Sequence, residues 1–204
     1  MEQEQRSSQW FEARLGKATA SRFNDLMRRT KSGYSSARQN YMAELVAERL
    51  TGGRYDNYTS KAMEWGIETE DSARLAYEFE SGNTVEETGF HEHTNMAAGA
   101  SPDGLVGVDG LVEIKCPNTA THIDTYIKQS LPNKYLAQVQ GQMWITGRQW
   151  CDFVSYDPRL PDHLQLVIIR VDRDDNYIAR LGTTVGQFLD VLDEMEELLS
   201  KETV

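Results

Sequence analysis

The spacing of apolar residues changes along this chain from helical to alternating and back to helical, and this order limits the folds it can adopt. Apolar positions three and four residues apart predict helices, whereas short alternating stretches between turn residues predict strands. Helices are expected at 21–29, from 35 or 36 to 50, and at 60–79, 120–129, 134–145 and from 174 to the C-terminus. Strands are expected at 84–90, 97–100, 111–115, 150–156 and 164–171.

This order predicts one domain of the α/β (α+β) class spanning residues 1–204, with one central mixed sheet flanked by helices. The strands are short and mixed with helices irregularly, which argues against a Rossmann fold or a barrel. No repeat or Pro/Gly-rich linker divides the sequence. A chain of 204 residues can also bury one substantial core without disulfides or metal.

Several protein classes are excluded by simple counts. The longest uninterrupted apolar run, 166–169, is far too short to cross a membrane, and the polar N-terminus is not that of a signal peptide. The two cysteines, Cys116 and Cys151, do not form a disulfide framework or a zinc motif. We therefore expect an intracellular, soluble protein without a membrane partner.

The net charge of −11 is unevenly distributed. Residues 1–50 carry nine Lys and Arg against six Asp and Glu, a balance of +3, so the remaining residues carry −14. This asymmetry is compatible with a local basic surface that binds a polyanion. It is also compatible with a solvated charged face, and on charge alone this second interpretation is favoured.

The centre of the chain carries a possible metal site. On the strand 111–115, Val112 and Ile114 are expected to face the core, so that Glu113 and Lys115 project together from the other face. Asp103 precedes a Gly turn into the neighbouring strand, where its carboxylate could meet that of Glu113. Two carboxylates suit Mg²⁺, and a lysine beside them can orient water or offset charge on a phosphate. The alternative is an exposed strand with a turn Asp and a Glu–Lys pair.

Two helices add polar groups to apolar faces. Glu70 falls on the apolar stripe of 60–79, so its carboxylate is expected either to pair with Arg74, four residues on, or to lie at the rim of the acidic site. Gln138 and Gln142 lie four residues apart on 134–145, where buried amides need partners. Hydrogen bonding within the core is the alternative to a role in the site.

The N-terminal segment 10–21 could bind phosphate. Arg14 offers a guanidinium fork, and Ser21 offers a hydroxyl at an expected helix start. Plain N-capping would also explain Ser21. His91 and His93, two residues apart on an expected strand, do not form a zinc-protease motif, and Cys116 is expected to be an inert thiol.

Six colinear segments resemble motifs of the lambda-exonuclease (YqaJ-like) family of phage recombination nucleases, within the PD-(D/E)xK restriction-endonuclease-like fold. They are W-x-x-x-R-L-G-x-x-T-A-S at 10–21, A-x-x-W-G-x-x-x-E-x-x-A-R at 62–74, S-P-D-G-L at 101–105, L-x-E-x-K-C-P at 111–117, Y-x-A-Q-V-Q at 135–140 and Y-D-P-R at 156–159. Each motif is weak alone, but six in the same order over nearly the whole chain are specific.

The resemblance implies a Mg²⁺-dependent exonuclease that degrades one strand of linear duplex DNA from 5′-phosphorylated ends and leaves a 3′ single strand for recombination. Matching positions assign the metal to Asp103, Glu113 and the Ile114 carbonyl, and the attacking water to Lys115, with Glu70 and Gln138 completing the catalytic site. They assign the 5′-phosphate and DNA to Arg14, Ser21, Ser101, Lys61 and Met63, the last as an apolar wedge. Thr121 and His122 stand where family members can carry an arginine, a departure that weakens the case for the wedge.

The resemblance also implies two Mg²⁺ ions per site, replaceable by Mn²⁺, a homotrimeric ring around DNA, and a single-strand annealing protein as partner. A phage or prophage would encode the protein, which would act in the cytoplasm of a bacterial host. One alternative is a PD-(D/E)xK endonuclease or nickase that cuts within a duplex. Another is a catalytically silent scaffold that binds DNA ends.

Overall fold

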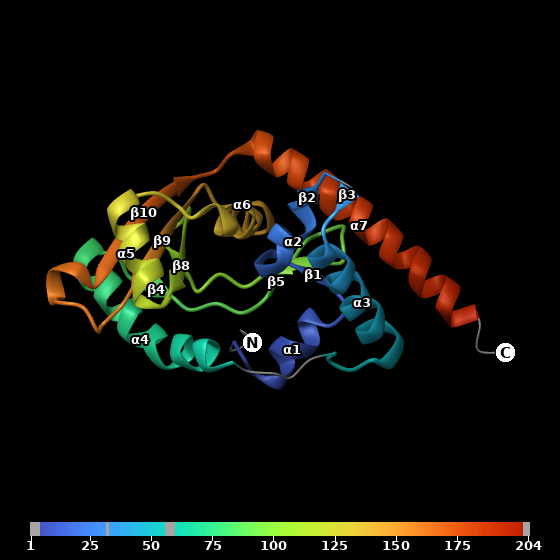
Figure 1. Cartoon of the computed structure of the whole chain (residues 1–204), viewed down its shortest axis with the longest axis horizontal. Coiled ribbons are helices and arrows are strands. Elements are labelled where there is room, and N and C mark those ends of the chain that lie inside the picture. Colours follow the sequence, from blue (N-terminus) through green and yellow to red (C-terminus); the bar gives the residue numbers. More distant parts are fainter. Residues whose placement is uncertain (1–4, 32, 56–59, 202–204) are drawn as a thin grey trace.

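The computed structural model describes residues 5–31, 33–55 and 60–201. A sheet-based half and a mostly helical half lie side by side (Figure 1). The helices are α1 (Ser8–Arg14), α2 (Phe23–Met27), α3 (Ser36–Thr51), α4 (Lys61–Ser81), α5 (Thr119–Lys128), α6 (Asn133–Thr146) and α7 (Asp175–Lys201), with short 3₁₀ turns at Ala20–Arg22 and Asp162–Leu164. The strands are β1 (Ala18–Thr19), β2 (Arg29–Thr30), β3 (Gly33–Tyr34), β4 (Val85–Glu86), β5 (His91–Glu92), β6 (Ala98–Ala100), β7 (Gly104–Val106), β8 (Gly110–Lys115), β9 (Trp150–Tyr156) and β10 (Leu166–Asp172).

The main sheet is mixed, as the sequence predicts. Its order is β10-β9-β8-β7-β4, and β8 pairs with β9 in parallel while the other neighbours are antiparallel. Side chains alternate between two buried faces. Val112, Ile114 and Val154 pack against Ala73 and Tyr77 of α4, and the opposite face packs against α6. The alternative of an exposed strand at 111–115 is therefore wrong.

The helical half has its own core, formed mainly by α2, α3 and α7, with β1 and β6 of a small second sheet. Helix α6 belongs to both cores, because Ala137 packs in the helical half while Val139 and Met143 pack against the main sheet. Gly141 lets α2 approach α6 closely, since a Cβ there would lie 2.5 Å from the Phe23 ring. The junction between the halves therefore runs along α6, and the polar residues described below lie on it.

Several expected elements are shorter or divided. The strand expected at 84–90 is reduced to Val85–Glu86, because its neighbour β7 has only three residues and two of them pair with β4. The helix expected at 21–29 is a 3₁₀ turn followed by α2, which ends at Met27, and Arg29–Thr30 pairs with β3 instead. There are three sheets rather than one in the part of the chain that the structure describes. Helices α3 and α4 end at Gly52 and Gly82 as expected, each in the left-handed conformation.

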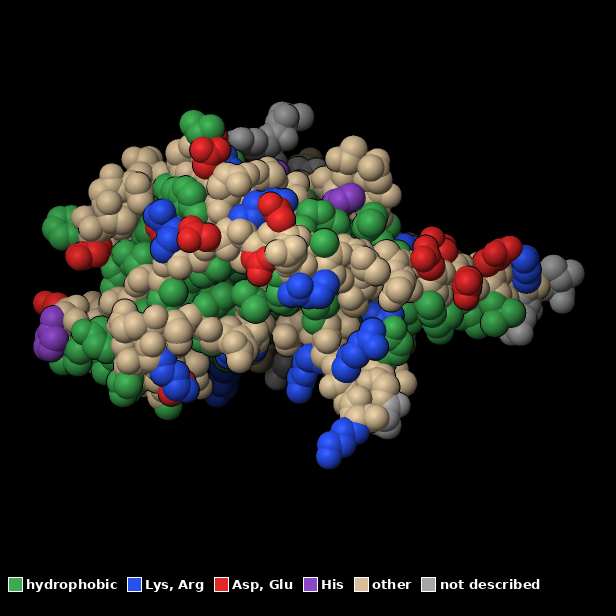
Figure 2. Space-filling model, turned by 90° about the horizontal axis from the view of Figure 1, so that it is seen from above, with side chains coloured by type: hydrophobic (Ala, Val, Ile, Leu, Met, Phe, Trp, Pro, Cys, Tyr) green, Lys and Arg blue, Asp and Glu red, His purple; other side chains and the backbone are tan. Residues whose placement is uncertain are grey.

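The end of α7 projects from the body, and Figure 2 shows acidic side chains gathered along it while Lys and Arg side chains project from the body beside it. No helix in 5–31, 33–55 or 60–201 combines the length and apolarity needed to cross a bilayer.

Candidate functional site

An inner cavity of about 160 Å³ lies at the junction between the two halves. Its walls come from α1, the turn before α2, the β6–β7 connection, β8 and α6. The residues that line it are Gln5, Trp10, Arg14, Ala20, Ser21, Ser101, Asp103, Glu113, Lys115, Gln138 and Gln142. Seven of the predicted site residues therefore meet in one cavity, although up to 124 positions separate them in the sequence.

Asp103, Glu113 and Lys115 form the charged centre of the inner cavity. The Asp103 Oδ2 accepts a hydrogen bond from the backbone N–H of Ile114 over 2.6 Å, which holds the carboxylate beside β8. Glu113 is fully buried, and the Lys115 ammonium pairs with its Oε1. Alternation along β8 thus places Glu113 and Lys115 on one face, as the sequence predicts, but that face is covered by α6.

The charges of this centre act on one another. Burial, reinforced by the neighbouring Glu113 carboxylate and by Glu70, raises the pKa of Asp103 well above its ordinary value. Burial alone would lower the pKa of Lys115, but Glu113 and Asp103 outweigh it and raise that pKa above its ordinary value. Lys115 is therefore a protonated cation at neutral pH. The two acids need a positive partner to remain ionised together.

Glu113 also receives two amide hydrogen bonds from α6. Gln138 Nε2 donates to Oε1 and Gln142 Nε2 donates to Oε2, each over 2.5 Å. The residues lie four positions apart and therefore share one helix face. Both amides therefore bond to a carboxylate that is buried in the core and also lines the inner cavity.

A second group of residues forms the basic end of the inner cavity. Arg14 Nη1 donates to the Ser101 hydroxyl over 3.1 Å, and the indole N–H of Trp10 donates to the same oxygen over 2.9 Å. The Arg14 guanidinium stacks 4.0 Å from the Trp10 ring centroid. No carboxylate among the described residues lies within ion-pair distance of it. Burial lowers the pKa of Arg14 to about 10. An anion bound in the cavity would offset the energetic cost of burying this charged guanidinium.

Ser21 lies at the mouth of this end. It is exposed and lies inside the 3₁₀ turn Ala20–Arg22 rather than at a helix N-cap, so capping does not explain it. Its hydroxyl lies 3.3 Å from the Thr19 hydroxyl. Arg14, Ser21 and Met63 also border a further cavity of about 350 Å³, together with Lys17, Arg22 and Arg54. Three of the nine basic residues of the N-terminal quarter, Arg14, Lys17 and Arg22, therefore lie beside the inner cavity.

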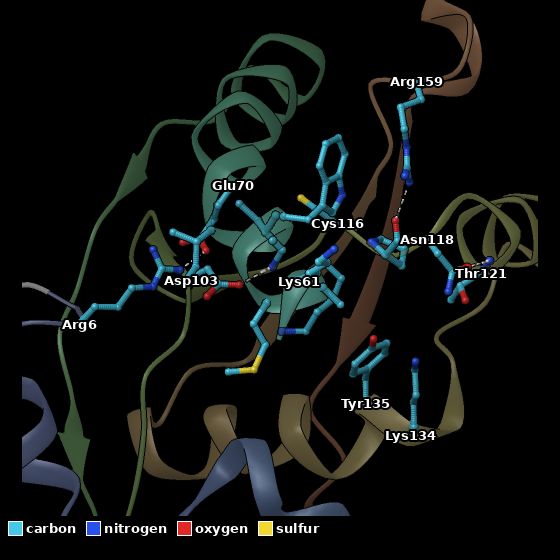
Figure 3. Close-up of a pocket in the computed structure, with 18 residues that line it drawn as sticks. Arg6, Lys61, Glu70, Asp103, Cys116, Asn118, Thr121, Lys134, Tyr135 and Arg159 are labelled. Atoms are coloured by element: carbon cyan, nitrogen blue, oxygen red, sulfur yellow. Dashed lines mark hydrogen bonds and ion pairs between the residues drawn. The ribbon is translucent and has the colours of Figure 1, made fainter. Parts of the chain in front are cut away.

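An outer cavity of about 720 Å³ adjoins the inner one, with Asp103 and Lys115 lining both (Figure 3). Lys61, Met63 and Glu70 line it from α4, and Ile114 lines it from β8. Met63 and Ile67 are about half exposed, so the first half of the expected inward stripe of α4 faces this cavity rather than the core. The wedge position, Met63, is thus at the edge of the outer cavity.

Glu70 does not pair with Arg74. Its Oε2 accepts a hydrogen bond from Arg6 over 2.5 Å, and Figure 3 shows Arg6 reaching toward Glu70 and Asp103. Arg74 instead pairs with Asp71 and Glu87. Glu70 therefore lies at the rim of the acidic site, which was the second of its two expected positions.

Four further residues of the outer cavity were not singled out by the sequence as site residues. Tyr135 and Lys134, at the start of α6, bring a ring and an ammonium next to Lys115, whose Nζ lies 5.7 Å from the Tyr135 centroid. Arg159 stacks 4.6 Å from the Trp65 ring centroid and is held by two hydrogen bonds from its side chain to Asp157, at 2.7 and 2.9 Å. Aromatic and cationic groups side by side are typical of surfaces that bind single-stranded nucleic acid.

Of the residues set aside in the sequence, Cys116 lines the outer cavity, whereas His91 and His93 border neither the inner nor the outer cavity. Burial raises the pKa of Cys116 to about 12, which makes its thiol a poor nucleophile. His93 packs against Trp144. Among the described residues no three His, Cys, Asp or Glu side chains form a metal-binding cluster, so a metal at this site would depend on two carboxylates and main-chain or water oxygens.

The chain is similar to known proteins in sequence and in fold. Residues 9–149 match the YqaJ-like viral recombinase domain. The alkaline exonuclease LHK-Exo of Laribacter hongkongensis is 50% identical over 96% of this chain and 97% of its own, with a TM-score of 0.89. A structure of LHK-Exo in complex with dAMP gives the same identity and coverage and a TM-score of 0.90.

Two further proteins are similar over part of their sequence or in fold. A phage-related exonuclease of Haemophilus somnus 129PT is 17% identical over 92% of this chain and 96% of its own, with a TM-score of 0.73, which shows a shared fold. The protein ExoD of Escherichia coli K12 is 34% identical over 67 residues, which are 32% of this chain and 75% of ExoD.

Proposed function

Because the chain belongs to the YqaJ-like viral recombinase family, we propose that it is a metal-dependent exonuclease that degrades one strand of linear double-stranded DNA. It starts at 5′-phosphorylated ends, proceeds 5′ to 3′ and leaves a 3′ single strand for annealing-type recombination. The alkaline exonuclease LHK-Exo, 50% identical over nearly the whole chain, supports the exonuclease class. We assign the activity to a single nuclease domain of residues 1–204.

One observation carries the end-dependent part of this proposal. The basic end of the inner cavity, at Arg14 and Ser101, and its acidic centre, at Asp103 and Glu113, share one space of about 160 Å³. A terminal phosphate carries more negative charge than an internal phosphodiester and suits the guanidinium fork of Arg14, which has no carboxylate partner within ion-pair distance among the described residues. Binding of that phosphate brings the next phosphodiester to the acidic centre. End recognition and cleavage are thereby coupled.

The acidic centre fits Mg²⁺. Asp103 and Glu113 supply carboxylate oxygens, which Mg²⁺ prefers, and their mutual repulsion is what a cation would offset. We propose that Asp103, Glu113 and the Ile114 carbonyl hold two such ions, with Mn²⁺ as a substitute. Bound Mg²⁺ would supply Lewis-acid stabilisation of the phosphodiester and lower the pKa of water.

The protein's own groups position the reactants. Lys115, a protonated cation paired with Glu113, donates hydrogen bonds toward the attacking water or the phosphate that gains charge. Gln138 holds Glu113, and Glu70 completes the rim of the site together with Arg6. Arg14, Ser21 and Ser101 fix the terminal phosphate. Water attacks the phosphorus, the bond from phosphorus to the 3′ oxygen breaks, and a proton from the water passes to that oxygen, which leaves as a 3′-hydroxyl. No covalent intermediate on the protein is needed.

The outer cavity is the path of the strand that enters the site. It continues from Asp103 and Lys115, and Lys61 and Lys134 contribute positive charge along it. Met63 borders both the outer cavity and the basic cavity beside α1, where an apolar side chain can separate the end of a duplex. The uncut strand is then released as the 3′ overhang, and we propose a single-strand annealing protein as its recipient, in the cytoplasm of a bacterium that carries the phage or prophage.

The decisive experiment uses linear and circular substrates. End-labelled linear duplex with a 5′-phosphoryl or 5′-hydroxyl end is incubated with the protein and Mg²⁺, beside a covalently closed circle of the same sequence. We expect fast loss of the 5′-phosphorylated strand, slow loss of the 5′-hydroxyl strand and an intact circle. Cleavage of the circle would instead identify an endonuclease or nickase, and binding of ends without cleavage would identify a scaffold.

The assignment of the acidic centre is tested in the same assay. Asp103→Ala and Glu113→Ala are expected to abolish cleavage, and Lys115→Ala to leave little cleavage while metal still binds. Circular dichroism checks that each variant folds. Substantial cleavage by Glu113→Ala would rule out Glu113 as a metal ligand.

A further inference from the structure

The Glu113 carboxylate is held at both of its oxygens by amides of one helix. Gln138 Nε2 donates to Oε1 and Gln142 Nε2 to Oε2, both over 2.5 Å. Gln138 is 9% exposed and Gln142 only 1%. With one donor on each oxygen, the plane of the carboxylate is fixed relative to α6.

Gln142 makes this contact while its own side-chain oxygen has no hydrogen-bond partner among the described residues. The Glu113 oxygen accepts from the Gln142 side-chain N–H, so the oxygen of the Gln142 amide points away from Glu113. That oxygen, Oε1, is buried. A buried polar atom without a partner is unfavourable for folding. The favourable contact of the Gln142 side chain is therefore made by its donor end, the N–H that hydrogen-bonds to Glu113.

Gln140 shows what a purely structural amide looks like on the same helix. It is 2% exposed, close to Gln142, but its Nε2 donates to the Asp172 carbonyl and its Oε1 accepts from the Asp174 N–H. Both ends are satisfied, and both fasten the connection between β10 and α7. Gln142 differs in that the hydrogen bond of its side chain goes to Glu113, and both residues line the inner cavity.

We propose that Gln142 is a positioning residue for metal binding. Its hydrogen bond, added to that of Gln138, holds the Glu113 carboxylate in the orientation that the divalent cation requires before the cation arrives. The inference rests on the proposed function in one respect, the role of Glu113 as a metal ligand. Partners behind a ligand typically change metal affinity or activity by about 10–100-fold when removed. Gln142 accordingly sets the affinity for Mg²⁺ rather than the cleavage step at saturating Mg²⁺.

The test compares Gln142→Met with Gln140→Met, each of which removes a buried amide from α6 at similar side-chain length. Calorimetric titration of the full chain with Mg²⁺ alone measures affinity without substrate or turnover. We expect Gln142→Met to bind Mg²⁺ roughly tenfold or more weakly. Gln140→Met should bind as the wild type does. Cleavage by Gln142→Met should return to near the wild-type kcat when Mg²⁺ is raised in proportion.

Wild-type Mg²⁺ affinity in Gln142→Met would overturn the inference, and so would an equal loss in Gln140→Met. Should Gln142→Met fail to fold by circular dichroism, Gln142→Ser removes the same donor with less bulk and is judged by the same criteria. Glu113→Ala distinguishes a failure of the metal site from a failure of the role of Gln142. If it binds Mg²⁺ as tightly as the wild type, the proposed metal site fails; if it binds weakly while Gln142→Met binds normally, only the role of Gln142 fails.

Discussion

Arg14 donates a hydrogen bond to the Ser101 hydroxyl over 3.1 Å, across 87 positions of sequence. Ser101 lies two residues before Asp103 and thus links the basic end of the inner cavity to its acidic centre. A shift of the Arg14 side chain would therefore be transmitted to the segment that carries Asp103. In the proposed function, this short connection would set the distance between the bound 5′ end and the bond that is cleaved.

Arg14→Ala should reduce the preference for 5′-phosphoryl over 5′-hydroxyl ends by roughly tenfold or more, since a hydrogen bond to a charged group contributes about 1.5–3 kcal/mol. Cleavage at saturating DNA should fall less. Initial rates on the two end-labelled substrates measure this ratio. Arg22→Ala is the control, because Arg22 borders the neighbouring basic cavity but is already paired with Asp25 and Glu44. A full wild-type preference in Arg14→Ala would place the phosphate pocket elsewhere.

Asp103→Asn should stabilise the metal-free protein. Burial and Glu113 raise the pKa of Asp103, so its ionised form opposes folding at neutral pH, and wild-type stability should increase as pH falls through that raised pKa. Asparagine can still accept from the Ile114 N–H and carries no charge. Urea unfolding in EDTA at pH 7 should give a higher midpoint for the variant than for the wild type.

The same Asp103→Asn variant should lose most of the stabilisation that Mg²⁺ gives the wild type. Asp109→Asn, in the exposed turn before β8, is the control and should change neither quantity. A destabilised Asp103→Asn in EDTA would show that the contacts of the Asp103 carboxylate outweigh its burial and its repulsion from Glu113.

Sequence patterns predicted the elements whose burial is periodic. Helices α3 and α4 and strand β9 were located to within a few residues because each keeps one face or both faces in a core, and glycines end the helices. Helix α1 has no buried residue, so no stripe reveals it, although Ser7 caps it. Strand β1 exists only through pairing with β6, about 80 positions away. Such contacts leave no local pattern.

The same distinction between local patterns and distant contacts applies to the residues of the site. Alternation on β8 was sufficient to place Glu113 and Lys115 on one face, whereas Gln138 was assigned to the site by the family resemblance and reaches Glu113 through the packing of α6 on the sheet. The i,i+4 rule was misleading for Glu70, because Arg74 has other acids within reach while Arg6 arrives from an irregular segment 64 positions away. Local spacing predicts contacts within one element and fails where a distant segment competes.

Lys134→Ala should weaken DNA binding in a way that depends on salt. Lys134 lines the outer cavity beside Tyr135 and has no ion-pair partner among the described residues, so a phosphate of the entering strand is its natural partner. Loss of one phosphate contact should reduce the slope of log K against log salt by about 1. Lys128→Ala, whose ammonium pairs with Asp124 on α5, should leave the slope unchanged. Anisotropy titrations in EDTA measure both without cleavage.

Arg159→Met should remove stability at neutral pH but much less in acid. Burial alone would raise the pKa of Asp157, but hydrogen bonds from Arg159 outweigh it and lower that pKa to about 2. The pair therefore stabilises the fold above pH 4, and this contribution, at most about 2 kcal/mol, is lost as pH falls from 4 to 2. Urea midpoints of wild type and variant should converge over that range. Arg148→Met is the control, because Arg148 donates only to the carbonyls of Gly107 and Gly110 and its effect should not depend on acid.

We expect the chain to assemble as a homotrimer. A chain of 23.2 kDa with a net charge of −11 is a poor clamp on its own. However, Arg14, Lys17 and Arg22 of its N-terminal quarter border one cavity, while acidic side chains gather on the projecting end of α7 (Figure 2). In a closed ring of three copies, one repeated interface suffices, and basic surfaces can face a central channel while acidic surfaces face outward. The product strand would then thread through the ring, so dissociation would not compete with each cut. Light scattering at micromolar concentration should therefore give about three times the chain mass, and long duplex should be degraded processively in the presence of a DNA trap. A monomer mass together with distributive digestion would refute the ring and the account of processivity built on it.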